Sequence, residues 1–277
     1  MLLCVCMAAF AVYLVYSALR ADTTPPVITV AGGSESVIEV SMADLHDVLL
    51  RDVTAQDERD GDVTSSILIE QIGGITDDNQ AQAVYAAFDA AGNVAKLRRT
   101  VRIIDYKQPR FTLDGPLNFI YGSNFDPLKL IGAEDLVDGD ISHRVKATLM
   151  DESAITAEGT HNVQFRVTNS LGDTVQLVLP VEVYYAGRYD AQLFLTDYLV
   201  YLPVNGDFAP ERYLDKYLVY GQATDLCGGV PTGLTLTTTG HVDTSKPGVY
   251  AVSYTMSSVR GNNTSYGYTR LIVIVEG

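Results

Sequence analysis

One acidic phrase occurs twice in this chain, and its spacing restricts the fold more than any other feature does. Residues 55–62 read AQDERDGD and residues 133–140 read AEDLVDGD, so the phrase returns after 78 residues. A period of this length suits a whole small domain rather than one turn of a solenoid. The 277 residues therefore predict two to three small domains in tandem, an organisation more typical of surface proteins than of enzymes.

Short runs of β-branched and aromatic residues recur along the chain after Arg20. The clearest runs are residues 27–30, 84–88, 100–104, 163–167, 177–183 and 271–275. Glycine-containing turns separate them, and this alternation of short strands and turns predicts antiparallel β-sandwiches. Short helical turns are expected only near residues 42–50 and 210–218.

The same three-part ending recurs three times: a strand, a turn and a final apolar strand. It predicts domains at residues 22–105, 106–186 and 187–277, of which the third is the most divergent. The linkers at 105–109 and 186–188 are short, so neighbouring domains should be held end to end with limited bending.

Three motifs carry a family resemblance: DTTPP at residues 22–26, the repeated A-x-D-x-x-D-G-D phrase, and FDAAGN at residues 88–93. Together they resemble the bacterial surface Ig-like repeats related to the hyalin repeat and to the Ig-like domains of pesticidal crystal toxins. The first domain matches the whole pattern. The second has TNSLGD at 168–173 where the family has D-x-A-G-N, and the third keeps only ATD at 223–225 and the final strands. The resemblance implies a β-sandwich that acts as a spacer or adhesive module, without enzyme activity.

The first 19 residues contain no charged side chain and would span about 28 Å as a helix, close to the thickness of a bilayer core. A cleaved signal peptide is the alternative, but it should carry a positive n-region and small residues before its cleavage site. Leu19 or Tyr16 stands where a small residue is needed. We therefore predict an uncleaved transmembrane signal anchor at residues 1–21, which places the chain in the cell membrane as a single-pass protein with its body extracellular.

The repeated phrase itself has two interpretations. Calcium binds six to eight oxygens, often carboxylates on a tight glycine-containing loop. The candidate ligands are Asp57, Asp60, Asp62, Asp135, Asp138 and Asp140, with Asp105 able to contribute from the linker. Aspartate also caps turn amides with its side chain, and glycine permits the turn backbone. Turn chemistry is the favoured interpretation, and calcium is the alternative cofactor.

Composition narrows the range of partners. The formal charge of −15 argues against nucleic acid and anionic membrane surfaces as main ligands. Cys227 is alone outside the first apolar run, so no disulfide is expected within the outer part, and a buried structural thiol is expected there. Tyrosine is abundant, with 17 residues, and is concentrated in the third domain. Core and corner packing is the favoured role for these rings, and a binding surface is the alternative.

Catalytic signatures are missing from the sequence. It has no G-x-S-x-G elbow, no H-E-x-x-H and no glycine-rich phosphate loop, and its four histidines are scattered. We therefore expect no enzyme, but a membrane-anchored extracellular Ig-like repeat protein that acts as an adhesion or spacer module. The alternative is a glycan-binding accessory protein of the cell surface, so the partner is a protein or a glycan. An exposed row of tyrosines in the third domain would favour the glycan, and buried tyrosines would favour the spacer.

Overall fold

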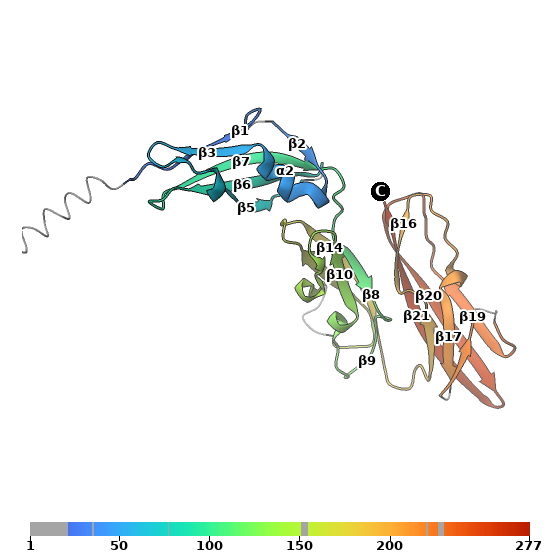
Figure 1. Cartoon of the computed structure of the whole chain (residues 1–277). Helices are drawn as coiled ribbons and strands as arrows, with labels where there is room; N and C mark the ends of the chain where they lie inside the picture. The colour runs from blue at the N-terminus through green and yellow to red at the C-terminus, as the bar shows by residue number, and fades with distance from the viewer. Residues whose placement is uncertain (1–21, 35, 77, 151–154, 220, 227–229) are drawn as a thin grey trace, which may run out of the picture. The chain divides into compact units, whose positions relative to one another are not determined.

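A computed structural model describes the chain apart from residues 1–21, 35, 77, 151–154, 220 and 227–229 (Figure 1). The described residues are nearly all β, as predicted, and form six sheets. They divide into two compact units. The first unit runs to Lys107 and includes Ser170–Asp173, and the second comprises Gln108–Asn169 and Thr174–Gly277. The expected domain boundaries at residues 105/106 and 186/187 stay a prediction.

The first unit contains two sheets. One has the order β1 (Val27–Val30), β3 (Val53–Asp57), β4 (Gly61–Asp62). The other has the order β2 (Ile38–Val40), β7 (Val94–Ile103), β6 (Gln80–Phe88), β5 (Leu68–Gly73). The helical turn expected near residues 42–50 is confirmed as η1 (Met42–Asp44) and α2 (Leu45–Arg51), and η2 (Thr64–Ser66) follows β4.

Alternation along the strands builds the core of this unit. In β3 every second residue is buried, which places Val53, Ala55 and Asp57 on the core face. In β6 the same alternation buries Ala83, Tyr85 and Ala87, together with their neighbour Ala81. Because side chains alternate between the two faces of a strand, a polar residue that ends such a series also points inward.

The second unit contains the remaining four sheets, which form two sheet pairs. The earlier pair consists of β8 (Arg110–Leu113), β10 (Ile131–Asp135) and β11 (Gly139–Asp140) in one sheet, with β9 (Asn118–Ile120), β14 (Thr174–Tyr184), β13 (Gly159–Thr168) and β12 (Lys146–Leu149) in the other. The later pair consists of β15 (Ala191–Leu195), β17 (Leu214–Val219) and β18 (Gln222–Asp225) in one sheet, with β16 (Leu199–Pro203), β21 (Asn263–Glu276), β20 (Gly248–Arg260) and β19 (Leu234–Thr239) in the other. Below, the earlier pair is called the middle sandwich and the later pair the last sandwich.

Three short 3-10 turns complete the second unit: η3 (Pro127–Lys129), η4 (Ser142–Arg144) and η5 (Pro210–Tyr213). The helical turn expected at residues 210–218 is therefore confirmed only for its first four residues, because β17 begins at Leu214. Alternating apolar residues in this segment pair with β15 instead of continuing the turn.

The pairing is antiparallel, as predicted, except at three places. The pairs β2–β7, β9–β14 and β16–β21 are parallel. In each sandwich the chain leaves the first strand and crosses to the opposite sheet. There the second strand lies along the edge of the last strand and runs in the same direction. Local residue patterns do not encode this crossing, because parallel partners are distant in sequence.

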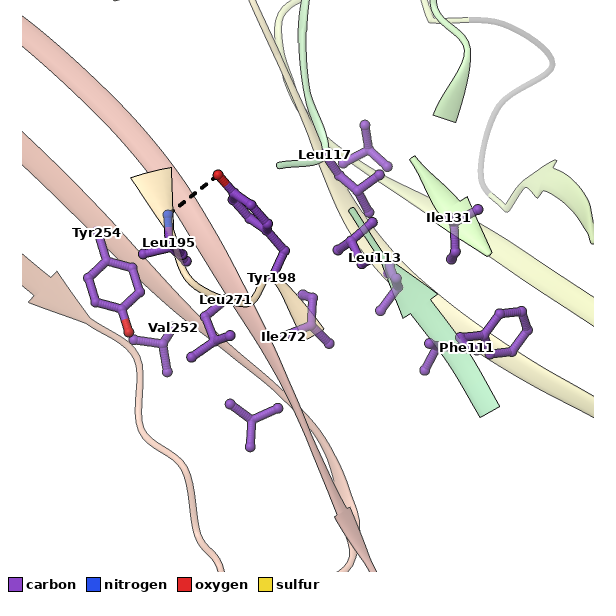
Figure 2. Close-up of a cluster of buried hydrophobic side chains, with 14 of the residues drawn as sticks. Phe111, Leu113, Leu117, Ile131, Leu195, Tyr198, Val252, Tyr254, Leu271 and Ile272 are labelled. Carbon is purple, nitrogen blue, oxygen red and sulfur yellow. Dashed lines mark hydrogen bonds between the residues drawn. The ribbon is translucent and has the colours of Figure 1, made fainter. Parts of the chain in front are cut away.

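One buried cluster joins the two sandwiches of the second unit. It includes Phe111 and Leu113 of β8 and Tyr198 and Ile272 of the last sandwich (Figure 2). A cluster of this kind means that the two sandwiches bury apolar surface against each other where they meet.

Candidate functional site

The carboxylates of the first acidic phrase are engaged in turn bonds. Asp57 Oδ1 accepts bonds from the backbone N–H of Arg59 and of Asp60, both at 2.8 Å. Asp60 Oδ2 accepts from the Ala90 N–H at 2.8 Å. Asp62 Oδ1 accepts from the Thr64 N–H at 2.9 Å, and hydrogen bonding from the side chain and backbone of Thr64 lowers the pKa of Asp62.

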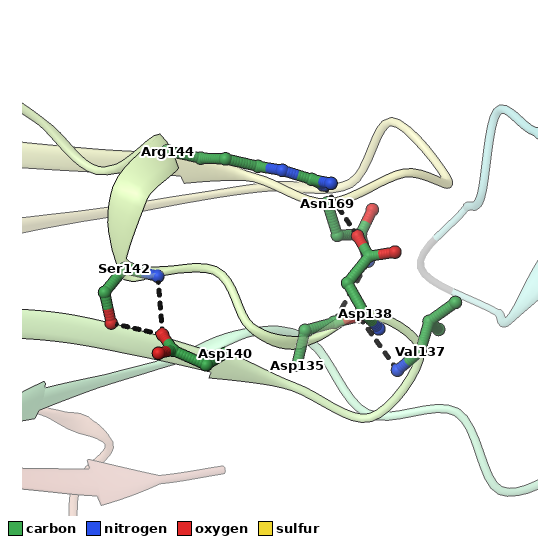
Figure 3. A network of polar contacts seen from close by, with 7 residues as sticks. All are labelled: Asp135, Val137, Asp138, Asp140, Ser142, Arg144 and Asn169. Atoms are coloured by element: carbon green, nitrogen blue, oxygen red, sulfur yellow. Dashed lines mark hydrogen bonds and ion pairs between the residues drawn. The ribbon is translucent and has the colours of Figure 1, made fainter.

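The second phrase repeats this pattern (Figure 3). Asp135 Oδ1 accepts bonds from the N–H groups of residues 137 and 138, at 2.9 and 3.0 Å. Asp140 Oδ1 accepts from Ser142 Oγ at 2.6 Å and from its N–H at 2.9 Å, and these bonds lower the pKa of Asp140. Asp138 Oδ2 pairs with Arg144 Nη1 at 2.7 Å. Turn capping accounts for this chemistry, and neither phrase gathers its own three aspartates into a group of closely spaced ligands among the described residues.

A different set of carboxylates comes together in the first unit. Asp22, Asp57 and Asp89 each offer an oxygen, and these oxygens lie within 4.8 Å of one another. Asp57 is the last core-facing residue of β3. Asp89 follows β6 in step with its buried positions, and Asp22 lies four residues before Pro26, a buried residue directly preceding β1. The ends of β3 and β6, one from each sheet, and the segment that leads into β1 therefore bring the group together.

Two oxygens of these three carboxylates lack a hydrogen-bond donor. Asp22 Oδ2 and Asp57 Oδ2 are buried without a partner, and Asp57 as a whole is only 6% exposed. A buried polar atom left unpaired costs about 1–3 kcal/mol, more when it is charged. Among the described residues, no Lys, Arg or His forms an ion pair with any member of the group. The group is therefore an electrostatically unbalanced, oxygen-rich site.

Asp89 is held in place by Asn93. Its Oδ1 accepts from the Asn93 N–H at 2.7 Å, and its Oδ2 accepts from Asn93 Nδ2 at 2.6 Å. Burial acts to raise the pKa of Asp89, but the hydrogen bonds from Asn93 and the following turn outweigh it, so the pKa is lowered. Asn93 Nδ2 also lies 3.1 Å from the backbone oxygen of Asp22, which fixes the N-terminal segment beside the hairpin.

The middle sandwich closes the equivalent position. Asn169 follows β13 where Asp89 follows β6, and its Nδ2 donates to Asp135 Oδ2 at 3.1 Å (Figure 3). Asp105 precedes β8 by five residues, as Asp22 precedes β1. Its carboxylate accepts from Ser41 Oγ at 2.7 Å and from the Met42 N–H at 2.8 Å, and these bonds, chiefly that from Met42, lower its pKa. Asp105 thus caps η1 in the first unit. Both of its carboxylate oxygens accept hydrogen bonds there, so neither is free for the calcium contribution expected from the linker.

Most described tyrosines of the last sandwich are buried or half-buried. Tyr198 and Tyr254 are buried, at 8% and 0% exposed. Among the tyrosines described from Tyr184 onward, only Tyr185 and Tyr266 are exposed, at 52% and 53%. Burial raises the pKa of Tyr201 to about 12. The described residues therefore present no continuous row of exposed rings.

Polar contacts reinforce the shared core of the second unit. Tyr201 Oη accepts from the Phe111 N–H at 2.8 Å and lies 3.2 Å from the Phe111 carbonyl oxygen, to which it can donate. Arg270 Nη2 lies 3.6 Å from Glu182 Oε2, with both side chains about 85% buried, and its Nη1 donates to the Pro180 carbonyl at 3.1 Å. Each contact joins the last sandwich to the middle one.

No protein-family model and no curated protein matches the sequence. Among solved structures, the chain is similar to Drosophila N-cadherin EC1-4, at 12% identity and TM-score 0.24, covering 72% of this chain and 58% of that one. It is also similar to Drosophila N-cadherin EC1-3, at 12% identity and TM-score 0.29, covering 87% and 98%. A third is CBM51-2 with GlcNAc and INT domains from Clostridium perfringens ZmpB, at 12% identity and TM-score 0.23, covering 91% and 44%. The chain spans about half the length of the first and third of these. Similarity this low carries no argument about function.

Two expectations concern residues outside those that the structure describes. In the part of the chain that the structure describes, no helix is long and apolar enough to cross a membrane. The expected anchor at residues 1–21 and the expected buried thiol of Cys227 both lie outside the described residues.

Proposed function

We propose that this chain is a non-catalytic extracellular spacer or adhesion module, anchored in a bacterial cell membrane through residues 1–19. The observation that carries the proposal is the continuous core of the second unit, in which two sandwiches bury apolar side chains against each other. Bending at that junction would expose apolar surface at about 25 cal/mol per Å². A segment of two sandwiches therefore transmits position and force as one body, which is what a spacer requires.

The junction is also closed by specific contacts. Arg270 and Glu182 pair while largely buried, and Tyr201 bonds the backbone of β8. Buried polar contacts favour one relative arrangement of two surfaces, because other arrangements leave charges or backbone groups unpaired. These contacts support a fixed spacer over flexibly linked beads.

Glycan binding is the second candidate function. The partner that we propose is a protein or a glycan at the cell surface. Most described tyrosines of the last sandwich are buried or half-buried, which disfavours a flat sugar platform of exposed rings. The exposed rings of Tyr185 and Tyr266 remain as the place where such contact would occur. Calcium is the cofactor that we propose, and its support is the carboxylate group of the first unit.

Calorimetry of the full chain in detergent micelles tests the spacer. We expect the second unit to unfold in one transition whose calorimetric and van't Hoff enthalpies agree, because its sandwiches share a core. Separate transitions for the middle and last sandwiches would contradict a fixed spacer. Incubation of the same protein with a glycan array provides the second readout, and saturable binding there would favour the glycan-binding alternative.

A further inference from the structure

We propose that Asp22, Asp57 and Asp89 form a single calcium site in the first unit, and that the middle sandwich has lost the equivalent site. This inference gives residues to the calcium part of the proposed function and is independent of whether the chain is a spacer.

The geometry fits one ion. Calcium–oxygen distances are about 2.3–2.6 Å, so oxygens on opposite sides of one ion are about 4.8 Å apart. The three carboxylates offer oxygens within 4.8 Å of one another, so a single ion can contact all three with modest side-chain adjustment.

The unpaired atoms point to a ligand independently of the clustering. Asp57 is more than nine-tenths buried and already uses Oδ1 to cap its own turn, yet its Oδ2 has no donor. Asp22 Oδ2 is buried and unpaired as well, while its Oδ1 accepts from the Thr24 N–H at 3.1 Å. Each residue thus keeps one oxygen for its own turn and leaves the other for a cation.

The donor set selects the kind of ion. All three ligands are carboxylates, and no His or Cys joins the group among the described residues. Hard oxygen donors favour calcium or magnesium over zinc or copper. Magnesium usually keeps most of its water and takes one or two carboxylates in strict octahedral geometry, whereas calcium accepts an irregular set of carboxylates completed by water. Three carboxylates from three separate segments suit calcium.

The middle sandwich provides an internal comparison. There the Asn169 amide donates to Asp135 Oδ2, the atom equivalent to the unpaired Asp57 Oδ2. Asp105, which precedes β8 as Asp22 precedes β1, belongs to the first unit, where Ser41 and Met42 donate to its carboxylate. The Asn169 amide carries no charge and donates a hydrogen bond to Asp135, so no cation is needed at this position. The expected stoichiometry is therefore one calcium ion per chain.

The ion would join the two sheets of the first unit. Asp22 leads into β1, and Asp57 ends β3 in the same sheet, whereas Asp89 follows β6 in the other sheet. Calcium would therefore hold the N-terminal segment and both sheets together at this end of the sandwich.

The test is calcium titration of the full chain in detergent micelles, by isothermal calorimetry and by thermal unfolding in calcium chloride against a chelator. With a dissociation constant near 1 mM, as in extracellular modules, 10 mM calcium multiplies the folding constant of the first unit about elevenfold. We expect a rise of about 5 °C or more in its melting temperature. Absence of both calorimetric binding and a melting shift in the wild-type chain would overturn the site.

Asp89→Asn is the decisive variant, because it introduces the amide that the middle sandwich carries at Asn169. Asp89→Asn also removes an acceptor from one of the two bonds that Asn93 donates, so its unfolding in chelator is the baseline, and against that baseline it should lose the calcium response. Asp22→Asn should also lose most of the response, and provides the second variant if Asp89→Asn fails to fold. Asp140→Asn, which alters only a turn cap, is the matched control and should keep the full response. An undiminished response in both Asp89→Asn and Asp22→Asn would overturn the assignment even if calcium binds elsewhere.

Discussion

Removal of the Tyr201 hydroxyl should weaken the junction between the middle and last sandwiches. Strand β8 is an edge strand, with β10 on only one side. Residue Phe111 pairs with Ala133 of β10, but Ala133 directs its backbone N–H and C=O away from β8, to Ser142 and Ile141. The backbone groups of Phe111 therefore also point outward, where the Tyr201 hydroxyl meets both. Tyr201→Phe leaves these two groups unpaired.

The size of the expected destabilisation follows from the burial of Phe111. Phe111 is 1% exposed, and an unpaired buried backbone group costs about 1–3 kcal/mol. We expect Tyr201→Phe to destabilise the second unit by about 2 kcal/mol, since the carbonyl contact at 3.2 Å is the weaker of the two. The measurement is urea unfolding of the full chain, with the midpoint shift multiplied by the slope. Tyr185→Phe, in which the exposed hydroxyl of another tyrosine is removed, is the control and should change stability by less than about 0.5 kcal/mol.

The pH dependence gives a second readout of the same hydroxyl. Burial raises the pKa of Tyr201 from 10.0 to about 12 in the folded chain. A raised folded pKa means that the contribution is complete below pH 10 and is lost as the pH rises from 10 through 12. The stabilities of wild type and Tyr201→Phe should therefore converge by about 2–3 kcal/mol over this window. Equal losses in Tyr201→Phe and Tyr185→Phe at pH 7, or parallel curves at high pH, would refute the proposed role of the Tyr201 hydroxyl.

Three further outcomes are expected. Gly132→Ala should destabilise the middle sandwich by about 1–3 kcal/mol in urea unfolding, because a Cβ there would lie 2.6 Å from two neighbouring hydroxyl oxygens; an unchanged midpoint would mean that both move freely. Tyr85→Phe should cost the first unit about 1–2 kcal/mol, because the buried hydroxyl donates to the Leu49 carbonyl at 3.0 Å and the variant leaves that carbonyl unpaired; a neutral result would indicate replacement by water. Hydrogen bonds from Ser245, and then from Lys246, lower the pKa of the Asp243 carboxyl to about 2. This carboxyl should titrate near that value by NMR, and Ser245→Ala should raise its pKa. Its contribution to stability is complete above the ordinary pKa of 3.8 and is lost as the pH falls towards 2.

Local patterns predicted the strands and the turns, but not which of their ends meet. The runs at residues 27–30 and 163–167 are strands because alternation and β-branching act within a few residues. The parallel pairs could not be predicted in this way, since β16 and β21 are separated by the rest of the last sandwich. Such pairing depends on the crossing between sheets, which is a property of the whole sandwich.

The cluster of Asp22, Asp57 and Asp89 shows the same limit of prediction from local sequence. Asp57 was predicted as a ligand with its sequence neighbours Asp60 and Asp62, whereas its neighbours in space are Asp22 and Asp89. A usable signal existed: both missed residues lie in the motifs that carry the family resemblance, and Asp89 is in step with the buried positions of β6. Strand parity indicates which polar side chains turn inward, but only the packed sheets bring these three carboxylates together.

The parallel strand pairs also determine how each sandwich responds to pulling. When two parallel strands are drawn apart along their length, their hydrogen bonds are loaded in shear and must rupture together, whereas a hairpin pulled open at one end loses them one at a time. Strand β16 is held against β21 over five residue pairs, from Leu199 to Pro203. The corresponding patches β2–β7 and β9–β14 have three each. The last sandwich thus has the longest shear patch of the three, and under tension applied along these strands it should be the last to yield.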